Sequence, residues 1–200
     1  MSRQHLFGII KQVVDKYFDF MEEIRGNQYI AEEVPDAMTD HRHLPDDEEI
    51  TYWKPLPSTV TDTQLYLLEE FLGSQLPPSY KAFLQYLHFI ELPLGLPRIS
   101  FFKSIPDDWL DSMKEWIIGY PAELMDHGYL PIADYSDYGV VCFDSHGTTQ
   151  PDVDYPLVWL DHEDNYTKPR PLAANFVELF EKLDVQLDKW IVRKRAERDN

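Results

Sequence analysis

The chain has 200 residues, of which 44% are hydrophobic and 14% aromatic, so it can build one folded domain without disulfides or a structural metal. Its 36 acidic and 18 basic residues give a net charge of −18, which disfavours binding to nucleic-acid phosphates. This charge either attracts basic partner proteins or serves only to keep the protein in solution.

The chain has one cysteine, Cys142, which excludes an intramolecular disulfide and a cysteine-based zinc cluster. It lies in an apolar run, so we expect a buried core residue and not a nucleophile. The first residues lack the continuous apolar run of a secretory signal, and no stretch approaches the roughly 18 uncharged apolar residues of a membrane helix. We therefore expect a cytoplasmic protein without membrane association.

An amphipathic helix is predicted from Leu6 to about Arg25, because apolar residues recur there every three or four positions. An acidic segment, residues 32–49, follows with two prolines, and we interpret it as an irregular loop that leads to the main body. Its histidines, His41 and His43, are an alternative metal site, although histidines in a polar loop are usually solvated.

The remaining sequence predicts a mixture of helices and short strands. Helical spacing of apolar residues predicts helices over residues 61–72 and from Pro78, Asp107 and about Ala173. Alternating or continuous apolar runs predict strands over residues 98–102, 130–135, 139–144 and 156–160. The second and third of these strands are close enough to pair as an antiparallel hairpin. Turns or loops are predicted over residues 93–97 and 145–155.

No phosphate-binding glycine loop, nucleophile elbow or HExxH motif occurs in the sequence. The most concentrated cluster of metal-ligating residue types is Asp161, His162, Glu163 and Asp164, directly after a predicted strand. Carboxylates and a histidine at a strand end can hold a divalent cation, which leaves a metal-dependent hydrolase using residues 161–163 as an alternative. Adjacent strand residues point to opposite faces, so Asp161 and His162 need a bend to share a site. We predict no catalytic residue, metal or cofactor.

A partner-binding surface is predicted on the acidic segment and on a second acidic loop near residue 152. Trp53 lies beside the acidic segment and outside any clear amphipathic helix, so we expect it to be exposed, and tryptophan is enriched in binding hot spots. The predicted partner-binding residues are Glu32, Glu33, Asp46, Asp47, Glu48, Glu49, Trp53, Asp152 and Asp154.

Five segments in order along the chain resemble the SUKH superfamily, which includes the yeast Smi/Knr cell-wall regulators. They are residues 76–84 (LPPSYKAFL), 130–134 (LPIAD), 139–144 (GVVCFD), 158–163 (VWLDHE) and a C-terminal helix with Phe176. The positions that match the family pattern are Pro77, Tyr80, Phe83, Asp134, Gly139, Asp144, His162 and Glu163. The similar region runs from about Pro57 to Leu187 and departs at residues 87–90 (LHFI), where the family often has a glycine-containing segment.

This resemblance implies an α+β fold with a mixed, largely antiparallel sheet packed against several helices. We divide the chain into residues 1–56, the N-terminal helix and acidic loop, and residues 57–200, the SUKH-like domain. The resemblance also implies a protein-binding role, because many bacterial members are regarded as immunity proteins that neutralise toxins. We therefore expect an immunity protein for a basic, nuclease-type toxin domain. A regulatory adaptor with an endogenous partner, as among fungal members, is the alternative.

Overall fold

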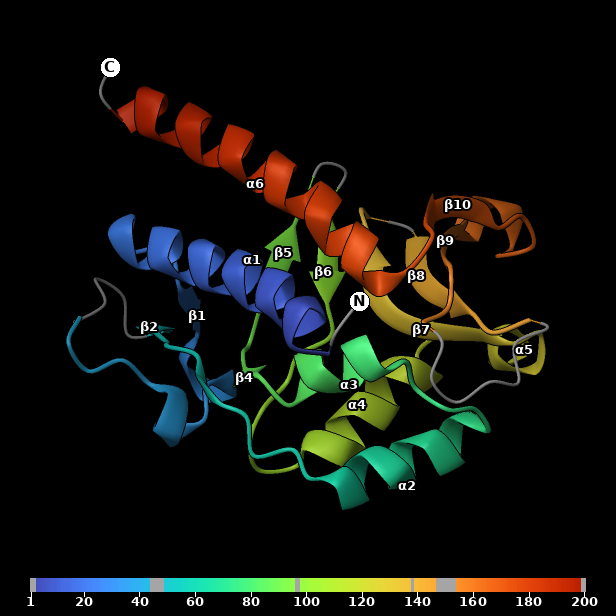
Figure 1. The fold of residues 1–200 in the computed structure, drawn as a ribbon. Helices are drawn as coiled ribbons and strands as arrows, with labels where there is room; N and C mark the ends of the chain where they lie inside the picture. The colour runs from blue at the N-terminus through green and yellow to red at the C-terminus, as the bar shows by residue number, and fades with distance from the viewer. Residues whose placement is uncertain (1–2, 44–48, 96–97, 138, 147–153, 199–200) are drawn as a thin grey trace.

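The computed structural model of the chain describes residues 3–43, 49–95, 98–137, 139–146 and 154–198 (Figure 1). It confirms the expected α+β class with a largely antiparallel sheet. The α-helices are α1 (Arg3–Glu23), α2 (Asp62–Leu72), α3 (Pro78–Leu84), α4 (Trp109–Ile118), α5 (Ala122–Asp126) and α6 (Phe176–Arg198). The strands are β1 (Gln28–Ile30), β2 (Ile50–Tyr52), β3 (Leu56–Pro57), β4 (Leu87–His88), β5 (Leu92–Leu94), β6 (Ile99–Phe101), β7 (Tyr129–Tyr135), β8 (Gly139–Asp144), β9 (Leu157–Asp161) and β10 (Arg170–Ala173).

The main sheet contains six strands in the order β10-β9-β8-β7-β6-β5, and each described pairing in it is antiparallel. The predicted hairpin is confirmed as β7–β8, with Tyr135 opposite Gly139. One prediction was wrong: the expected turn over residues 93–97 begins inside β5. Pro93 is tolerated there because β5 is an edge strand, which can lack a donor on its free side.

Local signals place the ends of α2 and the start of α3 as the sequence predicted. Thr61 and Gln64 form a reciprocal capping box at the start of α2, and Gly73 ends it with a left-handed φ of 64°. Pro78 occupies the first turn of α3, where a missing N–H is not needed. The C-terminal helix starts at Phe176 instead of about Ala173, because the preceding residues form β10 at the sheet edge.

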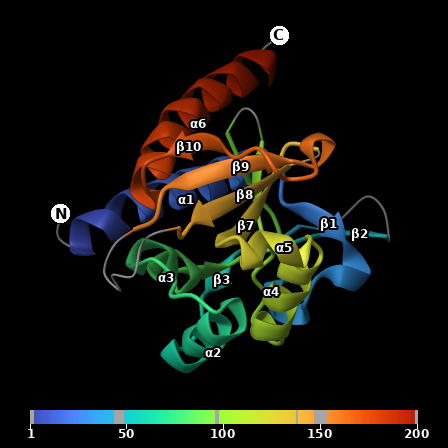
Figure 2. The same cartoon turned by 90° about the vertical axis from the view of Figure 1, so that its right-hand side faces the viewer.

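Helices α3 and α6 cover one face of the sheet, called here the first face (Figures 1 and 2). Phe83 on α3 and Phe176 on α6 pack their rings against Phe101 of β6, with centroid distances of 4.9 and 6.1 Å. Helix α1 lies along α6, and Trp190 packs against Phe20 at 5.1 Å. One hydrophobic cluster therefore joins the N-terminal helix to the body of the chain.

The other side of the sheet, called here the second face, has a smaller apolar cluster under α5. Val140 and Cys142 of β8 point to this side, while their neighbours in the strand belong to the first-face core. Cys142 is fully buried, as predicted, and burial raises the pKa of its thiol. Among the described helices, none is long and apolar enough to cross a membrane.

The segment between α1 and α2 is more ordered than the irregular loop that the sequence predicted. Strands β1 and β2 pair antiparallel, and two short 3₁₀ turns lie between them at residues 31–33 and 36–38. The expected exposure of Trp53 is wrong, because this residue is only 3% exposed. Its ring packs edge-to-face on Phe18 of α1 at 5.7 Å, so it attaches the ribbon to the core instead of facing solvent.

Candidate functional site

The described residues of the predicted acidic surface lie in two separate places. Glu32, Glu33 and Glu49 are exposed beside the β1–β2 ribbon. Asp154 lies elsewhere, accepting a 3.5 Å hydrogen bond from the Ser79 amide at the start of α3. Figure 1 places the ribbon and β9 on opposite sides of the molecule. The other predicted residues in these two segments, Asp46, Asp47, Glu48 and Asp152, lie outside the described residues.

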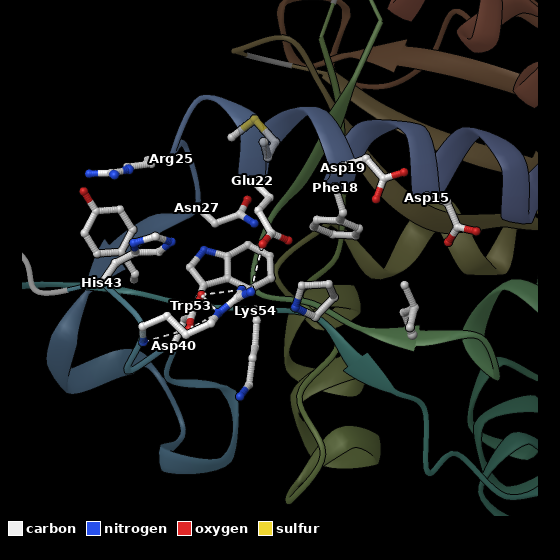
Figure 3. Close-up of a pocket in the computed structure, with 15 residues that line it drawn as sticks. Asp15, Phe18, Asp19, Glu22, Arg25, Asn27, Asp40, His43, Trp53 and Lys54 are labelled. Atoms are coloured by element: carbon white, nitrogen blue, oxygen red, sulfur yellow. Dashed lines mark hydrogen bonds and ion pairs between the residues drawn. The ribbon is translucent and has the colours of Figure 1, made fainter.

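A cleft of about 180 Å³ separates α1 from the segment that contains Trp53 (Figure 3). Arg42 spans it, with 2.7 Å and 2.8 Å contacts to Asp40 and Glu22 respectively. Hydrogen bonds from Arg42 lower the pKa of Asp40 to about 2. These contacts connect the loop to the helix, so the ion pairs of Arg42 bridge the cleft and have a structural role.

The family-type positions near α3 belong to the core. Tyr80 and Phe83 are each 3% exposed, and Pro77 precedes the first turn of α3. The Tyr80 ring packs edge-to-face on Phe143 and Phe176 at 5.3 Å each. These residues therefore stabilise the fold and cannot contact a partner directly.

Three other family-type positions line one hollow of about 560 Å³ on the second face: Asp134, Gly139 and His162. They come from the end of β7, the start of β8 and the turn after β9. Residues from neighbouring elements complete the lining: Arg98, Ser100, Tyr120, Ser136, Asp137 and Tyr166. The antiparallel meander brings these strand ends together, and the hollow presents carboxylates, hydroxyls and aromatic rings to solvent.

Tyr120 and Asp134 form the central polar contact of this hollow. The Tyr120 hydroxyl donates a hydrogen bond to the Asp134 carboxylate. Burial, followed by this contact with the carboxylate, raises the pKa of Tyr120 above its usual value. The Tyr166 ring stands edge-to-face to Tyr120 with centroids 6.2 Å apart. The lining is thereby held in place before any partner binds.

The close approach of neighbouring strands explains why position 139 is a glycine. An added Cβ would lie 3.0 Å from the Leu160 carbonyl oxygen and 3.1 Å from that of Tyr135. On the opposite side of the sheet, Tyr135 stacks on Trp159 at 4.4 Å, and the Arg170 guanidinium lies 4.2 Å from the Trp159 ring centroid. Gly139 leaves room between β7 and β9 for this close packing.

A second hollow of about 570 Å³ adjoins the first and shares Tyr166 with it. His127 and His146 line it together with Tyr129. The Nδ1 atoms of both histidines lie 2.6 Å from an oxygen: the Glu123 carbonyl for His127 and the Asp144 carboxylate for His146. Asp144, another family-type position, therefore positions a lining residue without lining the hollow itself.

The cluster at residues 161–164 is a structural turn. The Asp161 side chain accepts the Glu163 amide at 3.0 Å, and this bond, with the Arg170 contact, lowers the pKa of Asp161. Arg170 also contacts Asp164 at 2.6 Å. The strand ends at Asp161, which supplies the bend that His162 needs to lie 3.3 Å from it. Among the described residues, no three His, Cys, Asp or Glu side chains are placed to hold a metal ion.

Sequence reasoning considered Tyr120 for a recognition surface but missed the other tyrosines and histidines of the second face: Tyr129, Tyr166, His127 and His146. They come from helix ends, turns and the first residue of β7, where no periodic pattern marks a face. One signal was available in the sequence. Consecutive residues of β8 are apolar, so apolar side chains point to both faces of the sheet. That pattern indicates that both faces are covered, and so that other elements pack on the second face.

A known family model matches more than half of the chain. The model of the SMI1 / KNR4 family (SUKH-1) matches residues 59–182. No curated protein matches the chain. The matched range contains the whole six-stranded sheet and both hollows, while α1, the β1–β2 ribbon and most of α6 lie outside it.

Proposed function

Because the chain belongs to the SMI1/KNR4 family (SUKH-1), we propose that it is an immunity protein that neutralises a cognate toxin by binding it directly. The proposed partner is a basic toxin domain, of the nuclease type, met in the cytoplasm. Neutralisation requires only that the toxin's active site is covered, so the protein needs no catalytic residue, metal or cofactor of its own.

One observation carries this proposal: Asp134, Gly139 and His162 line the same solvent-filled hollow on the second face. The core positions of the family pattern already account for the fold, whereas Asp134 and His162 make no contribution to a hydrophobic core. Their placement beside Tyr120 and Tyr166 offers a partner aromatic rings and hydrogen-bonding groups together. Tyrosine is enriched among residues that dominate binding energies.

The net charge of −18 supports a basic partner. A nuclease must hold phosphates with lysine and arginine, so its binding surface is positively charged. An acidic protein attracts such a surface over several ångströms and increases the association rate. Salt shortens this range from about 10 Å at 0.1 M to about 3 Å at 1 M. The proposal therefore predicts association that slows markedly as salt is raised.

A genetic and binding experiment tests the proposal. An immunity gene is expected beside the gene of its toxin, so the neighbouring toxin domain is produced with and without this protein in growing cells. Protection from the toxin, together with a stable complex of the purified proteins, is the expected result. If the cells die equally in both cases and no complex forms, the immunity proposal is wrong.

Two substitutions test whether the second face is the binding surface. Tyr166→Ala removes the ring shared by both hollows, and Asp134→Asn removes the charge held by Tyr120. Tyr66→Ala is a matched control, because Tyr66 is 56% exposed on α2, outside both hollows. The first two variants are expected to bind the toxin domain at least about tenfold more weakly, and the control to bind normally. Equal binding by all three would move the docking surface elsewhere.

A further inference from the structure

The β1–β2 ribbon presents an apolar pair to solvent. Because strand side chains alternate, Ile30 and Ile50 lie directly opposite each other on the same side of the ribbon. Ile30 is 53% exposed and Ile50 is 37% exposed. Gln28 and Tyr52 form the next cross-strand pair on this side. The paired isoleucines form a small apolar patch of the kind that a partner can cover.

Carboxylates surround this pair. Glu32 and Glu33 lie in the 3₁₀ turn that follows β1, and Glu49 precedes β2, with its carbonyl accepting the Ala31 amide at 2.9 Å. Asp36 is exposed on the next turn. The described residues from Gln28 to Asp40 and from Glu49 to Tyr52 include no lysine or arginine.

Two bases near these acids are already engaged. Lys103 contacts Glu33 at 3.2 Å and lies over the Tyr29 ring, and Arg42 contacts Asp40 at 2.7 Å. Glu32 and Asp36 differ from these acids. Among the described residues, no base forms an ion pair with either side chain, and neither side chain takes part in a hydrogen bond. An apolar centre with an acidic rim is the complement of a basic surface that carries an apolar side chain.

We infer that the outer side of the β1–β2 ribbon, centred on Ile30 and Ile50, is a second docking surface for the basic toxin domain. This inference rests on the proposed function, because the occupant is the same partner. The ribbon lies outside the residues that match the family, so it adds recognition that the family fold does not supply. Trp53 holds the ribbon against α1, so the surface is formed before binding.

The test uses the purified domain of the neighbouring toxin, with its active site inactivated, as the probe. The double variant Ile30→Thr, Ile50→Thr keeps the β-branched shape and removes the apolar surface. Val185→Thr is the matched control, because Val185 is 54% exposed on α6, against 53% for Ile30. The ribbon variant is expected to raise the Kd by about tenfold or more, and the control by less than about twofold. Unfolding midpoints of all variants are measured to check that each remains folded.

A charge reversal gives an independent measurement. Glu32→Lys is expected to slow association at low salt by about threefold or more, because a rim charge mainly affects the association rate. Glu181→Lys, at an exposed position on α6, is its control and is expected to change the rate less.

The outcomes separate the two proposals. If the wild-type protein does not bind the toxin domain, the immunity function fails and the ribbon proposal fails with it. If the wild-type protein, the Ile30→Thr, Ile50→Thr variant and the Glu32→Lys variant all bind alike, the ribbon proposal alone is overturned. Loss of binding in Tyr166→Ala with normal binding in the ribbon variants would confine docking to the second face.

Discussion

The two faces of the six-stranded sheet use aromatic residues in different ways. On the first face, phenylalanine rings from α3, α6 and two strands of the sheet, β6 and β8, pack together and are almost fully buried. On the second face, tyrosines keep their hydroxyls near carboxylates and border two hollows. The first arrangement maximises buried apolar area, and the second leaves polar groups within reach of a partner. Substitutions on the first face should therefore affect stability, and those on the second face binding.

The largest expected effect is on the first face. Phe176 is fully buried and packs against Phe83, Phe143 and Phe180. Phe176→Ala is expected to lower the free energy of unfolding by about 3–5 kcal/mol, because it leaves a cavity in the core. Urea denaturation measures this change. Phe71→Ala, at a 37% exposed position on α2, is the control, and an equal loss in both would contradict the comparison.

A smaller effect on the free energy of unfolding is expected at Gly139, the first residue of the central strand β8. Gly139→Ala places a Cβ 3.0 Å from the Leu160 carbonyl oxygen, so β8 must move relative to β9. We expect a loss of about 1–3 kcal/mol and a change in the near-ultraviolet circular dichroism of the stacked Tyr135 and Trp159. Gly8→Ala on α1, where nothing lies within 4 Å, should instead stabilise by about 0.5–1 kcal/mol. A neutral Gly139→Ala would show that this close approach is not needed.

On the second face, removal of one hydroxyl is expected to have a modest effect on stability. Tyr120→Phe removes the hydrogen bond to Asp134 and should cost about 1 kcal/mol. Tyr66→Phe removes the hydroxyl that contacts Glu70 at 2.5 Å on exposed α2, and should cost about 0.5 kcal/mol or less. Thermal unfolding of both variants measures the difference. A loss from Tyr120→Phe as large as that from Phe176→Ala would remove the distinction between the faces.

The last prediction concerns pH and a buried histidine near the first-face core. His88 is fully buried; its Nε2 accepts the Thr59 amide at 2.9 Å, so Nδ1 carries the proton and donates to Ser104 Oγ at 3.1 Å. Burial lowers the pKa of His88 below its usual 6.5. The unfolded chain therefore takes up this proton at higher pH than the folded chain, and stability falls as pH drops below about 6.5.

Urea midpoints at several pH values between about 7.5 and 5 test this dependence. His88→Asn is expected to be less stable at neutral pH and to lose less stability on acidification than the wild type. His41→Asn, at an exposed position, should keep the wild-type dependence. An unchanged slope in His88→Asn would assign the acid sensitivity to other groups.

The elements with strong local signals were predictable, and the site was only partly so. The Thr61 capping box, the strand over residues 139–144 and the hairpin before it depend on neighbouring residues, and all three are confirmed. The family-type segments in the sequence mark Asp134, Gly139 and His162 as family-pattern positions, and the structure brings these three residues together in one hollow. The partner-binding residues stay predictions, except that Trp53 is buried.

Trp53 illustrates what local patterns cannot supply. A tryptophan beside an acidic segment suggests exposure, but the ribbon folds back onto α1 and places the ring against Phe18. Strand β5 was missed for a similar reason, because a proline-containing run becomes a strand only when β6 offers an edge to pair with.

The sequence by itself determined the fold class, the acidic charge, the core positions of α3 and α6 and the family resemblance, because these depend on composition and on periodicities within single elements. Only the tertiary structure decided which polar residues share a surface. Tyr120, Asp134 and Tyr166 come from separate elements, and the pairing of β7 with β8 and β9 and the packing of the turns on the second face bring them together. Contacts between distant segments depend on the packing of the whole chain, which no local pattern encodes.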